Sequence, residues 1–81
     1  MLGKERLEKD ALLRIKWDKN LAPSEYTVSY LDRFSRKLKE VLYSDILLDG
    51  DYILVGDSAI PMHRIREIRC KGEVVWAKRR T

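Results

Sequence analysis

The sequence contains one histidine and one cysteine, and their scarcity excludes several kinds of site. A single cysteine cannot form an internal disulfide, which is typical of proteins from a reducing compartment. His63 and Cys70 cannot supply the three or four ligands of a usual zinc site. Phosphoester hydrolysis and transfer normally use two acid–base groups, and no second histidine is present. We therefore expect no metal and no cofactor, and catalysis has little support.

Glycine is also sparse, and long apolar runs are missing. Gly50, Gly56 and Gly72 are isolated turn residues, so the sequence has no phosphate-cradling loop motif. No apolar run approaches the ~20 residues that cross a bilayer. Charged residues begin at Lys4, which is too early for a secretory signal peptide. We therefore expect a cytoplasmic protein without a membrane partner, folded as a single domain over residues 1–81.

The positive charge of the chain is concentrated in its last quarter. Residues 61–81 contain seven Lys/Arg and two Asp/Glu, a net charge of +5. Residues 1–60 contain ten Lys/Arg and eleven Asp/Glu, a net charge of −1. A basic segment indicates a polyanionic partner such as RNA, although basic surfaces are often only solvated. The last quarter of the chain is therefore expected to contain the binding residues.

A helical pattern opens the chain. Leu7, Ala11 and Ile15 recur at i, i+4 and i+8 within a segment that has no internal Gly or Pro. This pattern predicts an N-terminal helix over residues 4–17. Trp17 is expected to widen the apolar face of this helix and to lie in the core or at the helix end.

Short strands are predicted for the remainder of the chain. Alternating apolar and polar residues between turn residues indicate strands at residues 26–30, 38–43, 52–55, 58–60, 66–70 and 73–78. Residues 44–48 fit a helical turn or a strand, and residues 62–64 fit a bend. The expected fold class is α+β, with the N-terminal helix packed on one strongly twisted antiparallel sheet of about six short strands within residues 26–79. Partial closure of that sheet is compatible with the pattern.

The last hairpin allows a more detailed prediction. A two-residue loop at residues 71–72 would place Ile68 opposite Val75, and these two side chains would face the core. Arg69 and Trp76 would then share the outer face, where an indole can stack on an RNA base while the cation holds the backbone. The alternative is that Trp76 lies under the N-terminal helix, because so small a sheet must bury one face.

Several strings of residues resemble a known family. Ile-Pro-Met-His-Arg-Ile at residues 60–65 resembles the C-terminal signature of a small archaeal-type family of uncharacterised proteins, also described as the RNA cyclic group end recognition domain. Further resemblance follows the same order along the chain at residues 14–18, 26, 44–46 and 72–76. Residues 33–38 depart from the family, since many members have a longer connection there with more Gly and Pro. The resemblance therefore does not carry a family contact over to this connection.

The resemblance implies an RNA-binding module that recognises phosphorylated 3′ ends, above all cyclic-phosphate ends, in RNA processing or repair. The family occurs beside RNA end-processing domains. It therefore implies partners acting in trans, such as an RNA ligase, a phosphoesterase or a nucleotidyltransferase. Two alternatives stay open. One is a cyclic phosphodiesterase that uses His63 with Glu67, and the other is a protein-interaction adaptor with a nonspecific basic surface.

His63 and Arg64 are the first candidates for the phosphate site. An arginine fork can donate two hydrogen bonds to a phosphate, and an imidazole can donate one. The alternative is that His63 satisfies a buried carbonyl and that Arg64 pairs with Asp57 or Asp45. Supporting contacts to RNA are expected from the remaining candidates of this quarter, namely Arg66, Arg69, Trp76, Lys78 and Arg79.

Overall fold

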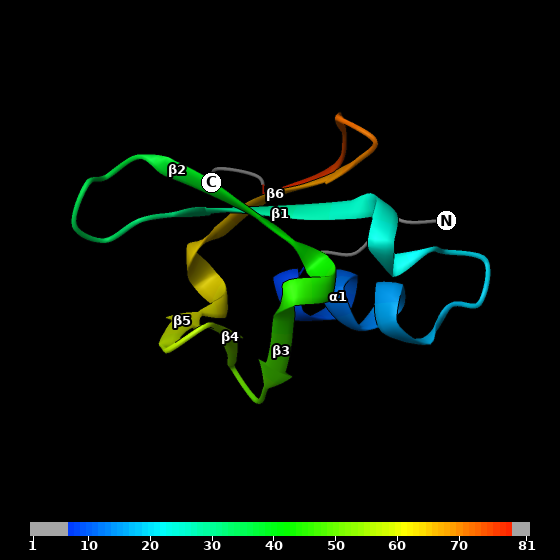
Figure 1. The fold of residues 1–81 in the computed structure, drawn as a ribbon, viewed down its shortest axis with the longest axis horizontal. Coiled ribbons are helices and arrows are strands. Elements are labelled where there is room, and N and C mark those ends of the chain that lie inside the picture. Colours follow the sequence, from blue (N-terminus) through cyan, green and yellow to red (C-terminus); the bar gives the residue numbers. More distant parts are fainter. Residues whose placement is uncertain (1–6, 79–81) are drawn as a thin grey trace.

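The computed structural model describes residues 7–78. Within this range one α-helix, α1 (Glu8–Trp17), is followed by seven strands in two antiparallel sheets. The four-stranded sheet has the order β2 (Leu38–Leu42), β1 (Tyr26–Leu31), β6 (Ile65–Cys70) and β7 (Glu73–Ala77). The three-stranded sheet has the order β3 (Ile46–Asp49), β4 (Tyr52–Val55) and β5 (Ser58–Pro61). Figure 1 shows the larger sheet along the top, with α1 and the smaller sheet below it.

Helix α1 packs on the strands through part of the predicted apolar stripe, because Leu7 precedes the helix and is 59% exposed. Ala11, Leu12 and Ile15 are fully buried in one core cluster with residues of both sheets. The helix ends at Trp17 as expected, and its first helical residue is Glu8. Residues 4–6 of the predicted helix lie outside the described residues. Trp17 is the last residue of α1, so its expected place at the helix end is confirmed, but it is 72% exposed and does not widen the buried face of the helix. None of the helices within residues 7–78 has the length and apolar character needed to span a bilayer.

Three 3-10 turns connect the elements, and two of them carry the chain between the sheets. After η1 (Pro23–Glu25), η2 (Tyr43–Asp45) joins β2 to β3, and η3 (Met62–Arg64) joins β5 to β6. A 3-10 turn has three residues per turn, so positions i and i+3 lie on the same side. The first residue of η3, Met62, and the residue that follows it, Ile65, are accordingly both buried. The two residues between them are left toward the surface.

The expected single sheet of about six strands is wrong. Residues 46–49 form a strand of their own, and η2 and η3 turn the chain away from the larger sheet and back again. The two sheets do not share a hydrogen-bonded strand pair within residues 7–78 and do not close into a barrel. The expected helix-on-sheet packing and the antiparallel pairing of consecutive hairpins are present.

The register of the last hairpin also differs from the prediction. Arg69 pairs with Val74 as expected, but the register shifts between Ile68 and Arg69, and Ile68 pairs with Trp76. The extra residue, Val75, forms a β-bulge, which moves the next side chain to the other face. Trp76 therefore shares the core face with Ile68 and is only 4% exposed.

Candidate functional site

Turn η3 presents His63 and Arg64 at the junction of the two sheets. The residues before and after them, Met62 and Ile65, are held in the core, and the Met62 backbone N–H donates to the Asp51 carbonyl at 2.9 Å. His63 is exposed and Arg64 is half-buried. The local sequence explains this arrangement, since two polar residues lie between two apolar residues at the spacing of one 3-10 turn. The bend predicted for residues 62–64 is confirmed.

The backbone carbonyl of His63 accepts hydrogen bonds from two basic side chains of residues 61–81. Arg66 Nη1 and Lys78 Nζ both donate to this oxygen, each at 2.9 Å. Lys78 Nζ also donates to Glu8 Oε2 at 2.9 Å, and Glu8 is a buried acidic residue at the start of α1. The fold thus places Arg66 and Lys78 beside His63. The hydrogen bonds of these two side chains, together with the pairing of Lys78 with Glu8, connect α1, η3 and the end of β7.

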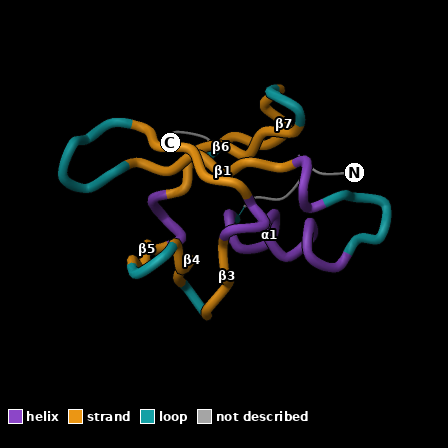
Figure 2. The backbone as a smooth tube through the Cα atoms, in the orientation of Figure 1, coloured by secondary structure: helices purple, strands orange, loops and turns teal. Residues whose placement is uncertain are grey.

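A groove lies beside Arg64, between η3, β5 and the connection that joins β1 to β2. Its volume is about 450 Å³, within the range of small-ligand sites. Its lining includes Tyr30, Arg33, Phe34, Lys39, Ser58 and Arg64. Figure 2 shows the β1–β2 connection as a long loop that extends from the body of the molecule. The groove therefore has one wall of core-anchored strands and one wall formed by this loop.

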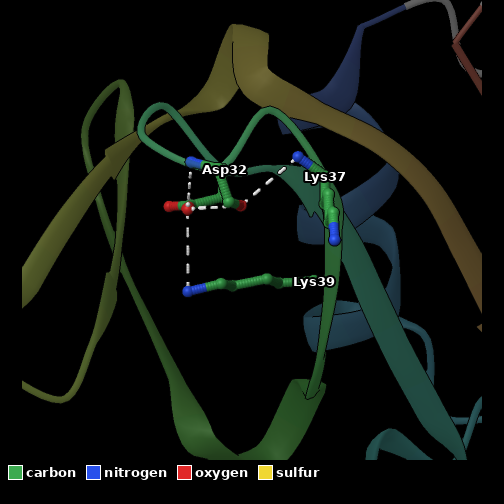
Figure 3. Close-up of polar contacts among 4 residues, drawn as sticks. Asp32, Lys37 and Lys39 are labelled. Carbon is green, nitrogen blue, oxygen red and sulfur yellow. Dashed lines mark hydrogen bonds and ion pairs between the residues drawn. The ribbon is translucent and has the colours of Figure 1, made fainter.

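Asp32 organises the loop side of the groove (Figure 3). Its Oδ2 accepts hydrogen bonds from the Ser35 backbone N–H at 3.0 Å and from Ser35 Oγ at 2.8 Å, and Lys39 Nζ lies 3.7 Å away. The Ser35 backbone bond, then the Ser35 hydroxyl and the Lys39 charge, lower the pKa of the Asp32 carboxyl below its ordinary value. Asp32 is therefore an anion that neutralises part of the Lys39 charge.

The groove retains positive charge after this pairing. It is lined by three cations, Arg33, Lys39 and Arg64, and by one carboxylate, Asp32. Within residues 7–78 the Arg64 guanidinium makes no ion pair or hydrogen bond, so the alternative of pairing with Asp57 or Asp45 is wrong. The Arg33 guanidinium carbon lies 5.8 Å from the centre of the Phe34 ring. An anion that enters this groove meets guanidinium groups without a competing carboxylate partner.

The remaining predicted site residues lie elsewhere. Arg69 Nη2 donates to Glu67 Oε1 at 3.2 Å, and its Nε is buried without a hydrogen bond. Trp76 is a core residue, so the predicted stacking of a base on its ring has no accessible surface. Arg79 lies outside the described residues. The part of the chain that the structure describes contains no group of three or more His, Cys, Asp or Glu side chains able to hold a metal ion.

Sequence reasoning missed the loop wall of the groove. The connection between β1 and β2 contains Arg33, Phe34, Arg36 and Lys37, and Phe34 is 88% exposed. The signal was present in the sequence, because a lone aromatic among basic residues in a loop has no strand face on which to be buried. Interleaved basic and aromatic residues are typical of surfaces that bind single-stranded nucleic acid.

Small archaeal proteins resemble the chain over nearly its full length. The profile of the MJ1316 RNA cyclic group end recognition domain matches residues 6–78. A UPF0248 protein of Metallosphaera sedula is 42% identical over 72 residues, which cover 86% of this chain and 90% of that protein. UPF0248 protein MJ1316 of Methanocaldococcus jannaschii is 34% identical over 74 residues, covering 88% and 92%. UPF0248 protein PF1300 of Pyrococcus furiosus is 34% identical over 74 residues, covering 89% and 88%. No solved structure matches significantly.

Proposed function

Because the chain belongs to the family of the MJ1316 RNA cyclic group end recognition domain, we propose that it binds RNA ends that carry a terminal phosphate, with a cyclic phosphate as the preferred end group. The family resemblance indicated by residues 60–65 is confirmed by the profile match over residues 6–78. The proposed role is end recognition in RNA processing or repair. A ligase, phosphoesterase or nucleotidyltransferase would then act on the held end in trans.

One observation carries this proposal. Arg64 lines a groove of about 450 Å³, has no ion pair within residues 7–78, and follows the exposed His63 on a turn anchored at both ends. A guanidinium can donate two parallel hydrogen bonds to the oxygens of a phosphate. The imidazole of His63 adds one donor from the neighbouring position. The end group would therefore be bound by η3, while the groove receives the nucleoside attached to it.

The other basic residues have supporting roles in this proposal. Arg66 and Lys78 hold the His63 carbonyl at 2.9 Å and so fix the orientation of η3. Contacts from Arg66, Arg69, Lys78 or Arg79 to the RNA backbone stay predictions. Such contacts would strengthen binding without distinguishing one end group from another.

The proposal is tested by fluorescence anisotropy with short RNAs that differ only at the 3′ end. The three ends are a cyclic phosphate, a linear phosphate and a free hydroxyl, each measured at two salt concentrations. Wild type is expected to bind the cyclic end most tightly. The Arg64→Ala variant is expected to lose about tenfold in affinity for the phosphorylated ends, since a hydrogen bond to a charged group contributes roughly 1.5–3 kcal/mol. The double variant His63→Ala, Arg64→Ala should lose the end preference altogether.

Lys19→Ala is the matched control, because it removes one exposed cation in the turn after α1 that does not line the groove. It should reduce affinity for all three RNAs by the same small factor and leave the preference intact. Arg64→Lys keeps the charge but not the planar fork, so it should restore salt-dependent affinity without the full end preference. Equal binding of all three ends by wild type would overturn the proposal.

The two alternatives lack a comparable observation. A phosphodiesterase that uses His63 with Glu67 needs these groups to act on one substrate, whereas Glu67 accepts a hydrogen bond from Arg69. A nonspecific basic adaptor would bind all ends alike, with an affinity that falls steeply with salt. The anisotropy series separates both from end recognition, provided that the RNA is recovered and its end group examined afterwards.

A further inference from the structure

Phe34 is the largest unexplained apolar feature of the described surface. It is 88% exposed, more than any other large hydrophobic residue within residues 7–78. It lies in the loop between β1 and β2 and makes no contribution to the core cluster. A single exposed hydrophobic residue is ordinary on a protein surface, but Phe34 lines the groove that Arg64 also lines, and this shared place points to a common ligand.

The loop that carries Phe34 is held in place by hydrogen bonds within the protein. The Asp32 backbone N–H donates to the Lys37 carbonyl and the Arg36 N–H donates to the Asp32 carbonyl, both at 2.9 Å. The Ser35 N–H and hydroxyl are bound to the Asp32 carboxylate as well. These bonds fix the backbone on both sides of Phe34. The ring is therefore held by an ordered loop, which lowers the entropy cost of binding a partner there.

Phe34 and Arg64 line the same groove, and the Arg33 guanidinium carbon lies 5.8 Å from the centre of the Phe34 ring. We propose that Phe34 is the stacking platform for the terminal nucleobase of a single-stranded RNA whose end phosphate is bound at Arg64. This inference rests on the proposed function and specifies its ligand as an end with an unpaired last base. An unpaired last base is free to turn toward the Phe34 ring, as in the single-stranded RNA sites where bases stack on aromatic side chains.

The charges around the ring support RNA as the occupant rather than an apolar protein segment. Three cations and one carboxylate line the groove, and the loop contributes the further cations Arg36 and Lys37. An apolar peptide would gain nothing from these charges, whereas the phosphates on both sides of a stacked base are attracted by them. The π-face of a base is sequence-tolerant, so the platform should accept any of the four bases.

The test uses two RNAs that share the same cyclic-phosphate end. In one RNA the last nucleotide carries 2-aminopurine, and in the other the last nucleotide is abasic. Stacking on an aromatic side chain contributes roughly 1–3 kcal/mol per base, so loss of the base should weaken wild-type binding about tenfold. Phe34→Ala should bind both RNAs equally and should not quench 2-aminopurine. Phe34→Leu should resemble Phe34→Ala, whereas Phe34→Trp should keep the difference.

Trp17→Ala is the matched control, because Trp17 is also exposed, at 72%, but lies outside the groove. It should retain the full difference between the two RNAs. If Phe34→Ala still binds the 2-aminopurine RNA more tightly than the abasic RNA, the stacking inference is overturned. If Phe34→Ala binds both RNAs as wild type does, while the anisotropy series still shows a preference for the cyclic end, stacking fails and the proposed function stands. The 2-aminopurine label is also placed on RNAs with a linear phosphate and with a free hydroxyl. If all three ends bind equally and show the same Phe34-dependent quenching, stacking stands while end recognition fails.

Discussion

The two hairpins at opposite edges of the four-stranded sheet use similar residues for different purposes. The β6–β7 hairpin contains Arg69, Trp76 and, directly after β7, Lys78, and the fold uses each of them internally. The β1–β2 hairpin contains Arg33 and Phe34, and neither belongs to the core or to an ion pair within residues 7–78. An aromatic ring or a cation therefore indicates a binding surface only where it is neither buried in the core nor paired within the fold.

The difference arises from where each aromatic residue lies along its hairpin. Trp76 is inside a paired strand, and the bulge at Val75 turns it toward the core next to Ile68. Phe34 is in the connection between two strands, where no sheet face is available to bury it. A small protein must bury large side chains wherever its sheets allow it. The exposed ring at Phe34 is therefore the more informative of the two.

The largest effect expected from this comparison is on stability. Trp76→Ala removes a buried indole and should lower the free energy of unfolding by about 3–5 kcal/mol, a large part of the stability of a small domain. Phe34→Ala should change it by less than about 0.5 kcal/mol, because Phe34 is exposed. Urea unfolding followed by circular dichroism measures both values. If Trp76→Ala unfolds completely, Trp76→Phe supplies a smaller decrease.

Binding data complete this comparison. Phe34→Ala should be fully folded and weakened in RNA binding, whereas Trp76→Phe should be destabilised and bind RNA normally when folded. The opposite pattern, with a stable Trp76→Ala variant that no longer binds RNA, would return the stacking role to Trp76.

The local elements of the fold were accessible from the sequence because short-range chemistry determines them. The spacing of Ala11 and Ile15 gave the buried face of α1, and Gly56 with Asp57 marked the loop between β4 and β5. Pro61 ends β5 at an edge of its sheet, as a residue without an amide donor should. Each of these features depends on neighbours within a few positions in the chain.

The long-range features were not accessible. The bulge at Val75 has no signal of its own, since Val74 and Val75 are equally suited to a strand, and it exists because Trp76 packs into the core. The chain is divided into two sheets because η2 and η3 each carry it from one sheet to the other. Each sheet is completed by contacts between residues that are far apart in sequence. For the candidate site, net charge pointed to the last quarter of the chain, but it did not distinguish Arg64, which has no ion pair within residues 7–78, from Lys78, which is bound by Glu8.

An intermediate effect is expected at the connection between Glu8 and Lys78. Lys78→Met should lower the free energy of unfolding by about 2 kcal/mol, because Glu8 is left buried without its charged donor. Lys71→Met is the control, since the Lys71–Glu25 pair is largely exposed and contributes at most about 1 kcal/mol. Chemical denaturation measures both. A Lys78→Met variant as stable as wild type, with RNA affinity reduced as far as in Arg64→Ala, would show that Lys78 belongs to the binding surface.

The smallest effect is expected at Asp32, and it tests whether the β1–β2 loop is ordered without RNA. In the folded protein the pKa of the Asp32 carboxyl is lowered, mainly by the Ser35 backbone N–H, then by the Ser35 hydroxyl and Lys39. An unfolded Asp has a pKa of about 3.9, so the stabilisation is present above that pH and is lost as the pH falls through the lower folded value. Asp32→Asn should therefore lower the thermal midpoint slightly at pH 7 but not at about pH 2.

Asp57→Asn is the control for this substitution, because Asp57 lies in the exposed loop of the β4–β5 hairpin. It should shift the thermal midpoint equally at both pH values, if at all. A difference between wild type and Asp32→Asn that is the same at both pH values would mean that the charge of Asp32 does not hold the loop. The loop that carries Phe34 would then be held by the backbone hydrogen bonds that Asp32 makes with Arg36 and Lys37, without a contribution from the charge of its carboxylate.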